Sequence, residues 1–404
     1  MAGLGATTLD LTRLRGRWSE LLATAKAPQG LGPTVESRLQ PVAKFGSNPG
    51  QLQMFTYVPD ELPPAPALVV VLHGCTQTAA AYEAGAGWST LAERYGFVLV
   101  CPQQSAANNQ KSCFNWFLPG DTARGEGEAL SIRQMVERAV VDHGVDRSRI
   151  FVTGLSAGGA MAAVMLATYP DVFAAGGIVA GLPYGSAANV QQALQAMFQA
   201  GGRPAAEWGD LVRAASPHRG PWPRLSIWHG GADAVVKPVN AGELVKQWTD
   251  VHGLPARPSG RDVVDGHARE VWRDAAGHDV IESFTIAGMG HGAPLRAGEA
   301  EGMCGTPGAF LLEVGISSSY HLAKFWGLAN GPARQASARA TAVPVPNGEV
   351  AYASPDGTVV MPPATAGAPP RRPAPGAVLR LGPGGNDIGS IITGALKAAG
   401  LMKG

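Results

Sequence analysis

Short apolar runs alternate with helical patterns along the middle of this chain, and the alternation limits the folds open to it. Strand-like segments lie near residues 51–58, 67–73, 96–101, 149–154, 175–180, 224–229 and 280–287. Helical patterns lie near residues 86–95, 128–143, 158–169, 240–252 and 317–328. Strands that alternate with helices form a mostly parallel sheet covered by helices on both faces. The sequence therefore predicts an α/β protein.

One pair of segments departs from this alternation. Residues 269–272 and 281–284 are both strand-like, and residues 275–279 join them through a Gly-containing turn. Two short strands joined in this way favour an antiparallel hairpin. We expect this hairpin at the edge of the sheet.

Aromatic residues indicate where the folded part of the chain ends. All nine tryptophans precede residue 330, and Tyr352 is the only aromatic residue after it. A segment without aromatics has little material for an independent core. We expect an N-terminal helix and linker over residues 1–40 and one α/β domain over 41–330. An Ala/Pro/Gly-rich disordered linker with a short C-terminal helix should follow over 331–404.

Each terminal helix has more than one interpretation. Leu11, Leu14 and Trp18 fall at helical spacing within residues 9–23, and Ile388 and Ile391 do so after Asn386. The N-terminal helix is expected to pack on the domain, with contact to a membrane or polymer surface as the alternative. The C-terminal segment is either a short docking helix or a frayed tail.

Charge and hydropathy exclude some classes of function. The chain carries 32 Lys and Arg against 31 Asp and Glu, a net charge of +1, which gives no electrostatic footprint for binding nucleic acid. No apolar run reaches the roughly 18 residues that a membrane span needs. The segment Met1 to Asp10 lacks the features of a signal peptide, so the cytoplasm is the cellular location expected by default.

The four cysteines are too few and too scattered for a zinc site or a disulfide scaffold. Cys101 lies in an apolar run and is expected to be a buried small side chain. Cys75 and Cys113 both lie in loops at strand ends, which makes a bridge between them plausible. Such a bridge would conflict with a cytoplasmic address, because disulfides persist in oxidising compartments.

Ser156 is the candidate nucleophile. It is central in Gly154-Leu155-Ser156-Ala157-Gly158, between a strand ending near residue 154 and a helix beginning near residue 158. A strand that turns abruptly into a helix exposes the central side chain at the carboxyl edge of the sheet, beside the free N–H groups of the helix. The flanking glycines fit a turn in which a Cβ would clash.

The partners of Ser156 should follow later strands, because functional groups gather at the carboxyl ends of parallel strands. Asp233 lies in the loop after the strand near 224–229, and His291 lies in a glycine-flanked loop after the strand near 280–287. His278 is the rival of His291. The rivals of Asp233 are Asp250, Asp262 and Asp265, which lie further from a strand end. His73 and His229 are expected to be packed and hydrogen-bonded to backbone.

The chain order Ser156, Asp233, His291 matches that of catalytic triads on the α/β-hydrolase fold. A serine hydroxyl is a poor nucleophile at neutral pH. An imidazole must take its proton and return it to the leaving group, while a carboxylate holds the imidazole in the correct tautomer. These three residues therefore predict nucleophilic catalysis by serine.

A tetrahedral intermediate also needs donors for its oxyanion. The N–H groups of Ala157 and Cys75 are the candidates, with a Cys75 thiol nucleophile as the competing idea for that residue. Trp116, in the aromatic loop 113–117, either lines the substrate site or folds its loop onto the domain. Gln77, in the same loop as Cys75, is a further candidate substrate contact.

Several motifs in this order resemble one known family. They are Leu72-His73-Gly74-Cys75-Thr76-Gln77, Asn115-Trp116-Phe117, Gly154-Leu155-Ser156-Ala157-Gly158-Gly159-Ala160-Met161 and Gly288-Met289-Gly290-His291-Gly292. They are similar to those of the short-chain polyhydroxyalkanoate (PHB) depolymerase esterases, a family that also includes feruloyl and acetylxylan esterases. The resemblance, over residues 40–330, implies secreted or periplasmic carboxylester hydrolases with a Ser-Asp-His triad and with no metal or organic cofactor.

Two departures bear on the substrate. Secreted depolymerases of this family carry a signal peptide and often a fibronectin-like linker with a substrate-binding domain, and neither is recognisable in this sequence. Soluble hydroxyalkanoate oligomers or small esters are therefore candidate substrates beside the polyester itself. Feruloyl or acetyl esters of plant polysaccharide are the second hypothesis. A non-catalytic granule- or surface-associated protein, anchored by the terminal helices, is the third.

Overall fold

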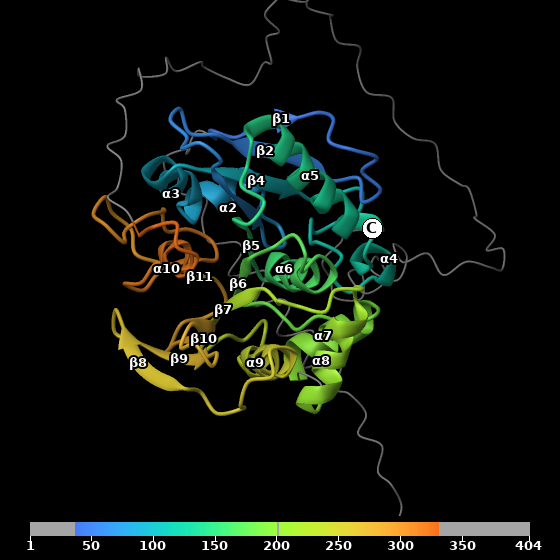
Figure 1. The fold of residues 1–404 in the computed structure, drawn as a ribbon, viewed down its shortest axis with the longest axis vertical. Coiled ribbons are helices and arrows are strands. Elements are labelled where there is room, and N and C mark those ends of the chain that lie inside the picture. The colour runs from blue at the N-terminus through green and yellow to red at the C-terminus, as the bar shows by residue number, and fades with distance from the viewer. Residues whose placement is uncertain (1–36, 200–201, 331–404) are drawn as a thin grey trace, which may run out of the picture. The chain divides into compact units, whose positions relative to one another are not determined.

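A computed structural model describes residues 37–199 and 202–330 of the chain, and its main element is a 10-stranded sheet (Figure 1). Hydrogen-bonded neighbours follow the order β1-β2-β4-β3-β5-β6-β7-β10-β9-β8. In chain order the strands are β1 (Gln40–Val42), β2 (Gln53–Tyr57), β3 (Ala67–Leu72), β4 (Phe97–Gln103), β5 (Ile150–Leu155), β6 (Ala175–Val179), β7 (Arg224–Gly230), β8 (Gly260–Val264), β9 (His267–Arg273) and β10 (Asp279–Ile286).

The centre of the sheet is parallel and its two ends are antiparallel. Strands β4, β3, β5, β6, β7 and β10 pair in parallel, whereas β1, β2, β8 and β9 form antiparallel pairs. Leu72 pairs with Gly154, and Val179 pairs with both Leu155 and Trp228. This register brings the carboxyl ends of β3, β5, β6 and β7 together at one edge of the sheet.

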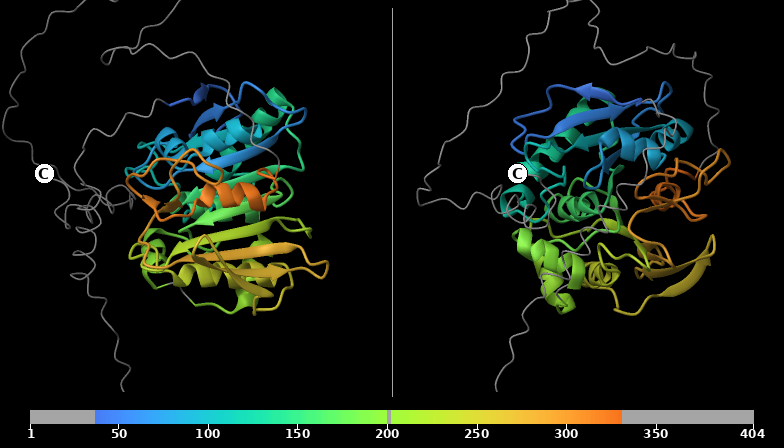
Figure 2. Two further views of the ribbon diagram at one scale, coloured as in Figure 1. Left: turned by 90° about the vertical axis from the view of Figure 1, so that its left-hand side faces the viewer. Right: turned by 180° about the vertical axis from the view of Figure 1, so that it is seen from behind.

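Helices cover both faces of the sheet, as Figures 1 and 2 show. One face carries α4 (Pro119–Thr122), α5 (Gly127–His143), α6 (Ala157–Thr168), α7 (Val190–Gln199), α8 (Ala205–Ala214) and α9 (Val239–Val251). The other carries α2 (Ala79–Gly85), α3 (Trp88–Tyr95) and α10 (Ser318–Phe325), beside a small parallel pair formed by β11 (Ala293–Leu295) and β12 (Leu311–Glu313).

Strand β3 shows why the sheet has two cores. All six of its residues are buried. Leu68 and Val70 pack into the core that contains Met161 of α6, whereas Val69 packs into the core that contains Trp88 of α3. Successive side chains of a strand point to opposite faces, so an unbroken apolar run is what a strand covered on both sides requires.

The predicted α/β-hydrolase fold is confirmed, and every expected strand and helix between residues 51 and 328 is present within a few residues. The hairpin is confirmed as β9 and β10, but the prediction that it forms the edge was wrong. Strand β8 pairs outside β9. Its sequence Gly-Arg-Asp-Val-Val is mostly exposed and presents no apolar face, so it carries no strand signal.

The terminal segments lie outside the described residues. These include the helix expected over 9–23, the linker over 331–385 and the helix expected after Asn386. The division into 1–40, 41–330 and 331–404 therefore stays a prediction. Within the described part of the chain, no helix has the length and apolarity needed to cross a membrane.

Candidate active site

Ser156 occupies a strained turn between β5 and α6. Its φ is 58° and its ψ is −115°, and few residues other than glycine adopt a positive φ. The surrounding structure holds this conformation, because the Ser156 N–H donates to the carbonyl of Val179 on the neighbouring strand at 2.9 Å. Such strain persists only where neighbouring contacts determine it, and it is frequent at functional sites.

The glycines on each side of Ser156 allow α6 to begin against the end of β3. A Cβ added to Gly158 would lie 2.2 Å from the carbonyl oxygen of Leu72 and 2.6 Å from that of His73. A Cβ on Gly154 would lie 2.3 Å from the carbonyl oxygen of Gly158. The motif therefore brings the first turn of α6 beside the loop that follows β3.

Asp233 and His291 meet Ser156 at the carboxyl edge of the sheet. Asp233 lies in the loop after β7, and His291 lies between β10 and β11. The His291 Nε2 is 2.9 Å from the Ser156 Oγ, and its Nδ1 is 2.7 Å from the Asp233 Oδ2. The structure thus joins the three predicted residues in one hydrogen-bonded series.

Asp233 is a buried carboxylate with all its oxygens engaged. Its Oδ1 accepts the N–H groups of Val235 and Val236 at 2.8 and 2.9 Å. Its Oδ2 faces His291 and also lies 3.4 Å from the His229 Nε2. Burial alone would raise the pKa of Asp233, but the hydrogen bonds to His229 and His291 outweigh it and hold the pKa well below its ordinary value.

The rival residues lie elsewhere. His278 is exposed and faces Asp274 at 3.1 Å. The three rival aspartates form ion pairs of their own, in the pairs Asp250 with Arg213, Asp262 with Arg269, and Asp265 with His321. None of these side chains takes part in the hydrogen-bonded series around Ser156, within the part of the chain that the structure describes.

His73 and His229 are buried and bonded to backbone, as predicted. The His73 Nδ1 lies 2.8 Å from the Gly74 carbonyl oxygen, and the His229 Nε2 lies 2.8 Å from that of Val236. The sequence did not reveal the second contact of His229, with Asp233. That contact depends on the turn after β7, which folds back so that both side chains meet.

The two expected oxyanion donors are free to bind a ligand atom. Among the described residues, neither the N–H of Cys75 nor that of Ala157 has a hydrogen-bond acceptor. The peptide that carries the Cys75 N–H is held by its carbonyl, because Gly74 accepts from His73 and from the N–H of Gln77. Their role as an oxyanion hole stays a prediction.

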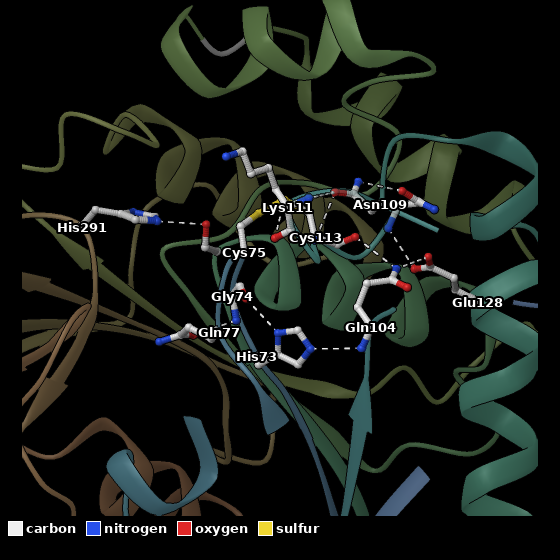
Figure 3. Close-up of a disulfide and its surroundings, with 12 residues drawn as sticks. His73, Gly74, Cys75, Gln77, Gln104, Asn109, Lys111, Cys113, Glu128 and His291 are labelled. Atoms are coloured by element: carbon white, nitrogen blue, oxygen red, sulfur yellow. Dashed lines mark hydrogen bonds between the residues drawn. A yellow bond between two sulfur atoms is a disulfide. The ribbon is translucent and has the colours of Figure 1, made fainter. Parts of the chain in front are cut away.

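Cys75 and Cys113 form a disulfide, drawn in Figure 3 beside His73 and Gln77. The plausible bridge is thus confirmed, and the competing idea of a Cys75 thiol nucleophile is wrong because that sulfur is already bonded. Cys101 is free and buried, as expected. No group of His, Cys, Asp and Glu suitable for a metal ion occurs in the described residues.

Removing the disulfide should lower stability markedly. The two cysteines are separated by 38 positions, and closing a loop of that length stabilises a fold by about 2–4 kcal/mol in the chain-entropy view. We expect the Cys75→Ser, Cys113→Ser double variant to lose that amount in urea unfolding at equilibrium. A loss below about 1 kcal/mol would contradict the expectation.

Gln77 and Trp116, the expected substrate contacts, both have structural partners. The Gln77 Oε1 accepts the Gly74 N–H at 2.9 Å, and its Nε2 donates to the Ala309 carbonyl at 3.5 Å. Trp116 is only 7% exposed and packs edge-to-face against Phe117 within the core. These contacts favour the alternative in which Trp116 folds its loop onto the domain.

Phe310 was not predicted. Its ring centroid lies 6.0 Å from that of His291, and its φ of 60° marks a constrained turn before β12. It comes from a segment with no strand or helix pattern, so no signal in the sequence links it to the site. An aromatic ring beside the imidazole gives the site an apolar wall.

Comparisons with known proteins agree with this geometry. A family model described as Esterase PHB depolymerase matches residues 57–271. A poly(3-hydroxyalkanoate) depolymerase C from Paucimonas lemoignei is 49% identical over 291 residues, which cover 72% of this chain and 70% of that protein. An acetylxylan esterase from Coprinopsis cinerea is 35% identical, with 66% and 72% covered. A feruloyl esterase B from Talaromyces stipitatus is 34% identical, with 65% and 74% covered.

A solved structure is also similar to this chain. The acetyl xylan esterase from Aspergillus awamori is 27% identical, with a TM-score of 0.61. The match covers 72% of this chain and 99% of that one. Its fold is therefore contained almost entirely in the part of the chain matched here.

Proposed function

The chain belongs to the esterase family of PHB depolymerases, and we propose that it hydrolyses poly(3-hydroxybutyrate)-type polyester or its oligomers through an acyl-enzyme. Its relatives are serine carboxylester hydrolases, and so is this chain. The observation that carries the proposal is the continuous series from the Ser156 Oγ through His291 to Asp233. The polyester substrate is supported by the relative at 49% identity.

The reaction proceeds in two halves. His291 Nε2 takes the Ser156 proton as Oγ attacks the ester carbonyl, and the N–H groups of Cys75 and Ala157 stabilise the oxyanion. The C–O bond to the leaving alkoxide then breaks, and His291 returns the proton to it. Water, deprotonated by His291, then attacks the acyl carbonyl, the C–O bond to Ser156 Oγ breaks, and His291 returns the proton to Oγ as the acid leaves. Asp233 holds the imidazole in the tautomer with its proton on Nδ1.

A feruloyl or acetylxylan esterase is the second candidate. It is favoured by the relatives at 34% and 35% identity and by the TM-score of 0.61 with an acetyl xylan esterase. The third candidate, a non-catalytic granule- or surface-associated protein, has less support because the hydrogen-bonded series is complete. A docking role for the terminal helices would act beside catalysis and not in place of it.

One assay separates the substrates. The purified full chain is incubated in parallel with hydroxybutyrate oligomers, amorphous polyester, methyl ferulate and acetylated xylan, and the acids released are quantified. We expect 3-hydroxybutyrate release to exceed release of ferulate and acetate in kcat/KM by at least about tenfold. Faster ferulate or acetate release would favour the second candidate, and no release with any ester would contradict hydrolysis.

Docking to polyester can be tested separately from hydrolysis. Deleting residues 331–404 should reduce sedimentation with polyester granules while leaving hydrolysis of a soluble ester unchanged. Unchanged sedimentation would contradict docking through the C-terminal segment.

The Cys75–Cys113 disulfide supports location in an oxidising compartment. This agrees with the secreted or periplasmic location implied by the family and opposes the cytoplasmic location expected by default.

A further inference from the structure

Glu128, in the first turn of α5, is a fully buried acid that the reaction above does not use. Its exposed fraction is 0%, and within residues 37–199 and 202–330 no Lys, Arg or His pairs with it. Burial, and then the nearby Asp121 carboxyl, raise the pKa of Glu128 to about 8. Burying a carboxyl without a counter-ion opposes folding, so the contacts it makes call for an explanation.

Both Glu128 oxygens hold the segment that carries Cys113. The Asn115 backbone N–H donates a hydrogen bond to Oε2 at 2.8 Å, and the Gln104 side-chain Nε2 donates one to Oε1. The same Gln104 Nε2 donates to the carbonyl of Cys113 at 3.1 Å. Residues 113 and 115 are thus both fixed by Glu128, one directly and one through Gln104. Cys113 in turn is bonded to Cys75, the residue with the free N–H.

Gln104 links the same acid to the other side of Cys75. Its backbone N–H donates to the His73 Nε2 at 3.1 Å, which leaves the imidazole proton on Nδ1. That Nδ1–H donates to the Gly74 carbonyl. Burial lowers the pKa of His73 to about 4, so the ring keeps this neutral form at pH 7. In Figure 3 the loop of Gly74 and Cys75 lies between His291 and the pair Gln104 and Glu128.

The direction of the Cys75 N–H follows from this arrangement. Gly74 C=O and Cys75 N–H belong to one planar trans peptide, in which the two groups point in opposite directions. Fixing the carbonyl on His73 therefore fixes the N–H on the other side. The disulfide restrains the side chain of the same residue, and the Thr76 N–H donates to the Lys111 carbonyl at 2.7 Å.

We infer that Glu128 is a positioning residue, which acts through Gln104, His73 and the Cys75–Cys113 disulfide to orient the oxyanion donor of Cys75. The inference rests on the proposed function, because it assigns Glu128 to the same reaction. Glu128 makes no contact with Ser156, His291 or Asp233, and it is not placed to contact the ester. Its effect should appear in stabilisation of the tetrahedral species and not in binding of the ground-state ester.

The Glu128→Gln variant tests this assignment. Each oxygen of the acid, protonated or ionised, keeps a lone pair for its donor, whereas the NH2 end of the similarly shaped amide cannot accept, so either Gln104 or Asn115 loses its acceptor. We expect kcat for a p-nitrophenyl ester to fall by at least about tenfold with KM changed less than about twofold, since small misplacements cost up to about 100-fold. Rates are expressed per site titrated with a fluorophosphonate, which removes the influence of unfolded protein.

A second readout separates positioning from a merely structural role. A trifluoromethyl ketone forms a hemiketal when Ser156 Oγ adds to its carbonyl carbon, the serine proton moves to His291, and the oxyanion occupies the hole. Its inhibition constant should rise by the same factor by which kcat/KM falls. A structural role alone would reduce the titrated fraction and leave both constants per site unchanged.

The control is Glu137→Gln, which removes a carboxyl from the same helix. Glu137 is partly exposed and pairs with Arg133 and Arg147, so the kinetic and inhibition constants of Glu137→Gln should match those of the unmodified protein.

If Glu128→Gln does not fold, Gln104→Met is measured by the same two readouts, because it removes the side-chain donor to the Cys113 carbonyl. Constants equal to those of the unmodified protein would overturn the inference. An unmodified protein that hydrolyses no ester would contradict the proposed function instead.

Discussion

Replacing Ser156 with alanine is expected to lower kcat for a short p-nitrophenyl ester by about 10⁴- to 10⁶-fold, the range typical of a lost serine nucleophile. Alanine keeps the Cβ, so the strained φ of 58° changes little and the fold should be preserved. His291 would keep its bond to Asp233 but would have no hydroxyl to deprotonate. Steady-state kinetics and fluorophosphonate labelling measure the two consequences together, and labelling should disappear.

Ser148→Ala is the matched control for this variant. Ser148 is an exposed serine before β5, and its hydroxyl bonds to Asp146 at 2.7 Å, away from the site. Its kinetics and labelling should match those of the unmodified chain. Activity of Ser156→Ala above about 1% of the unmodified value, with unchanged melting temperature, would show that another nucleophile carries the reaction.

The sequence allowed the central sheet to be predicted because its strands are buried on both faces. An apolar run such as that of β3, with six buried residues between helical segments, is typical of a strand covered on both faces. Strand β8 was not predictable in this way, because three of its five residues are exposed. Strands β11 and β12 have three residues each, which is too few for a period to show. Helices α7 and α8 were also missed, although Val190, Ala193, Ala196 and Met197 of α7 fall at helical spacing.

The residues around Ser156 were predictable because the chemistry lies at strand ends. Asp233 and His291 each follow a strand of the parallel region, and parallel strands bring such loops to one edge. Glu128 could not be recognised from the sequence. A glutamate in the first turn of a helix is ordinarily an exposed residue that interacts with the helix dipole. Only the packing of α5 against the loop after β4 buries it and gives it Gln104 and Asn115 as partners.

Replacing Asp233 with asparagine should lower kcat by about 10³- to 10⁴-fold, the loss known for this change in serine-protease triads. The reason lies in how the carboxylate is held. Oδ1 accepts two backbone N–H groups, from Val235 and Val236, so the amide oxygen must take that position. The amide nitrogen then faces the His291 Nδ1 and donates to it. The imidazole proton is forced onto Nε2, which can no longer accept the Ser156 proton.

The Asp262→Asn variant is the control for this prediction. Asp262 pairs with Arg269 on the β8–β9 hairpin, and its loss should leave kcat unchanged. Steady-state kinetics on both variants, with melting temperatures to show that they fold, provide the comparison. A carboxylate is required at position 233 because the His291 Nδ1–H donates to the Asp233 Oδ2, and an amide nitrogen cannot accept it. The His229 Nε2, which bonds to the Val236 carbonyl, lies 3.4 Å from the same oxygen. Asp233→Asn activity within tenfold of the unmodified chain would mean that the tautomer of His291 is fixed by another group.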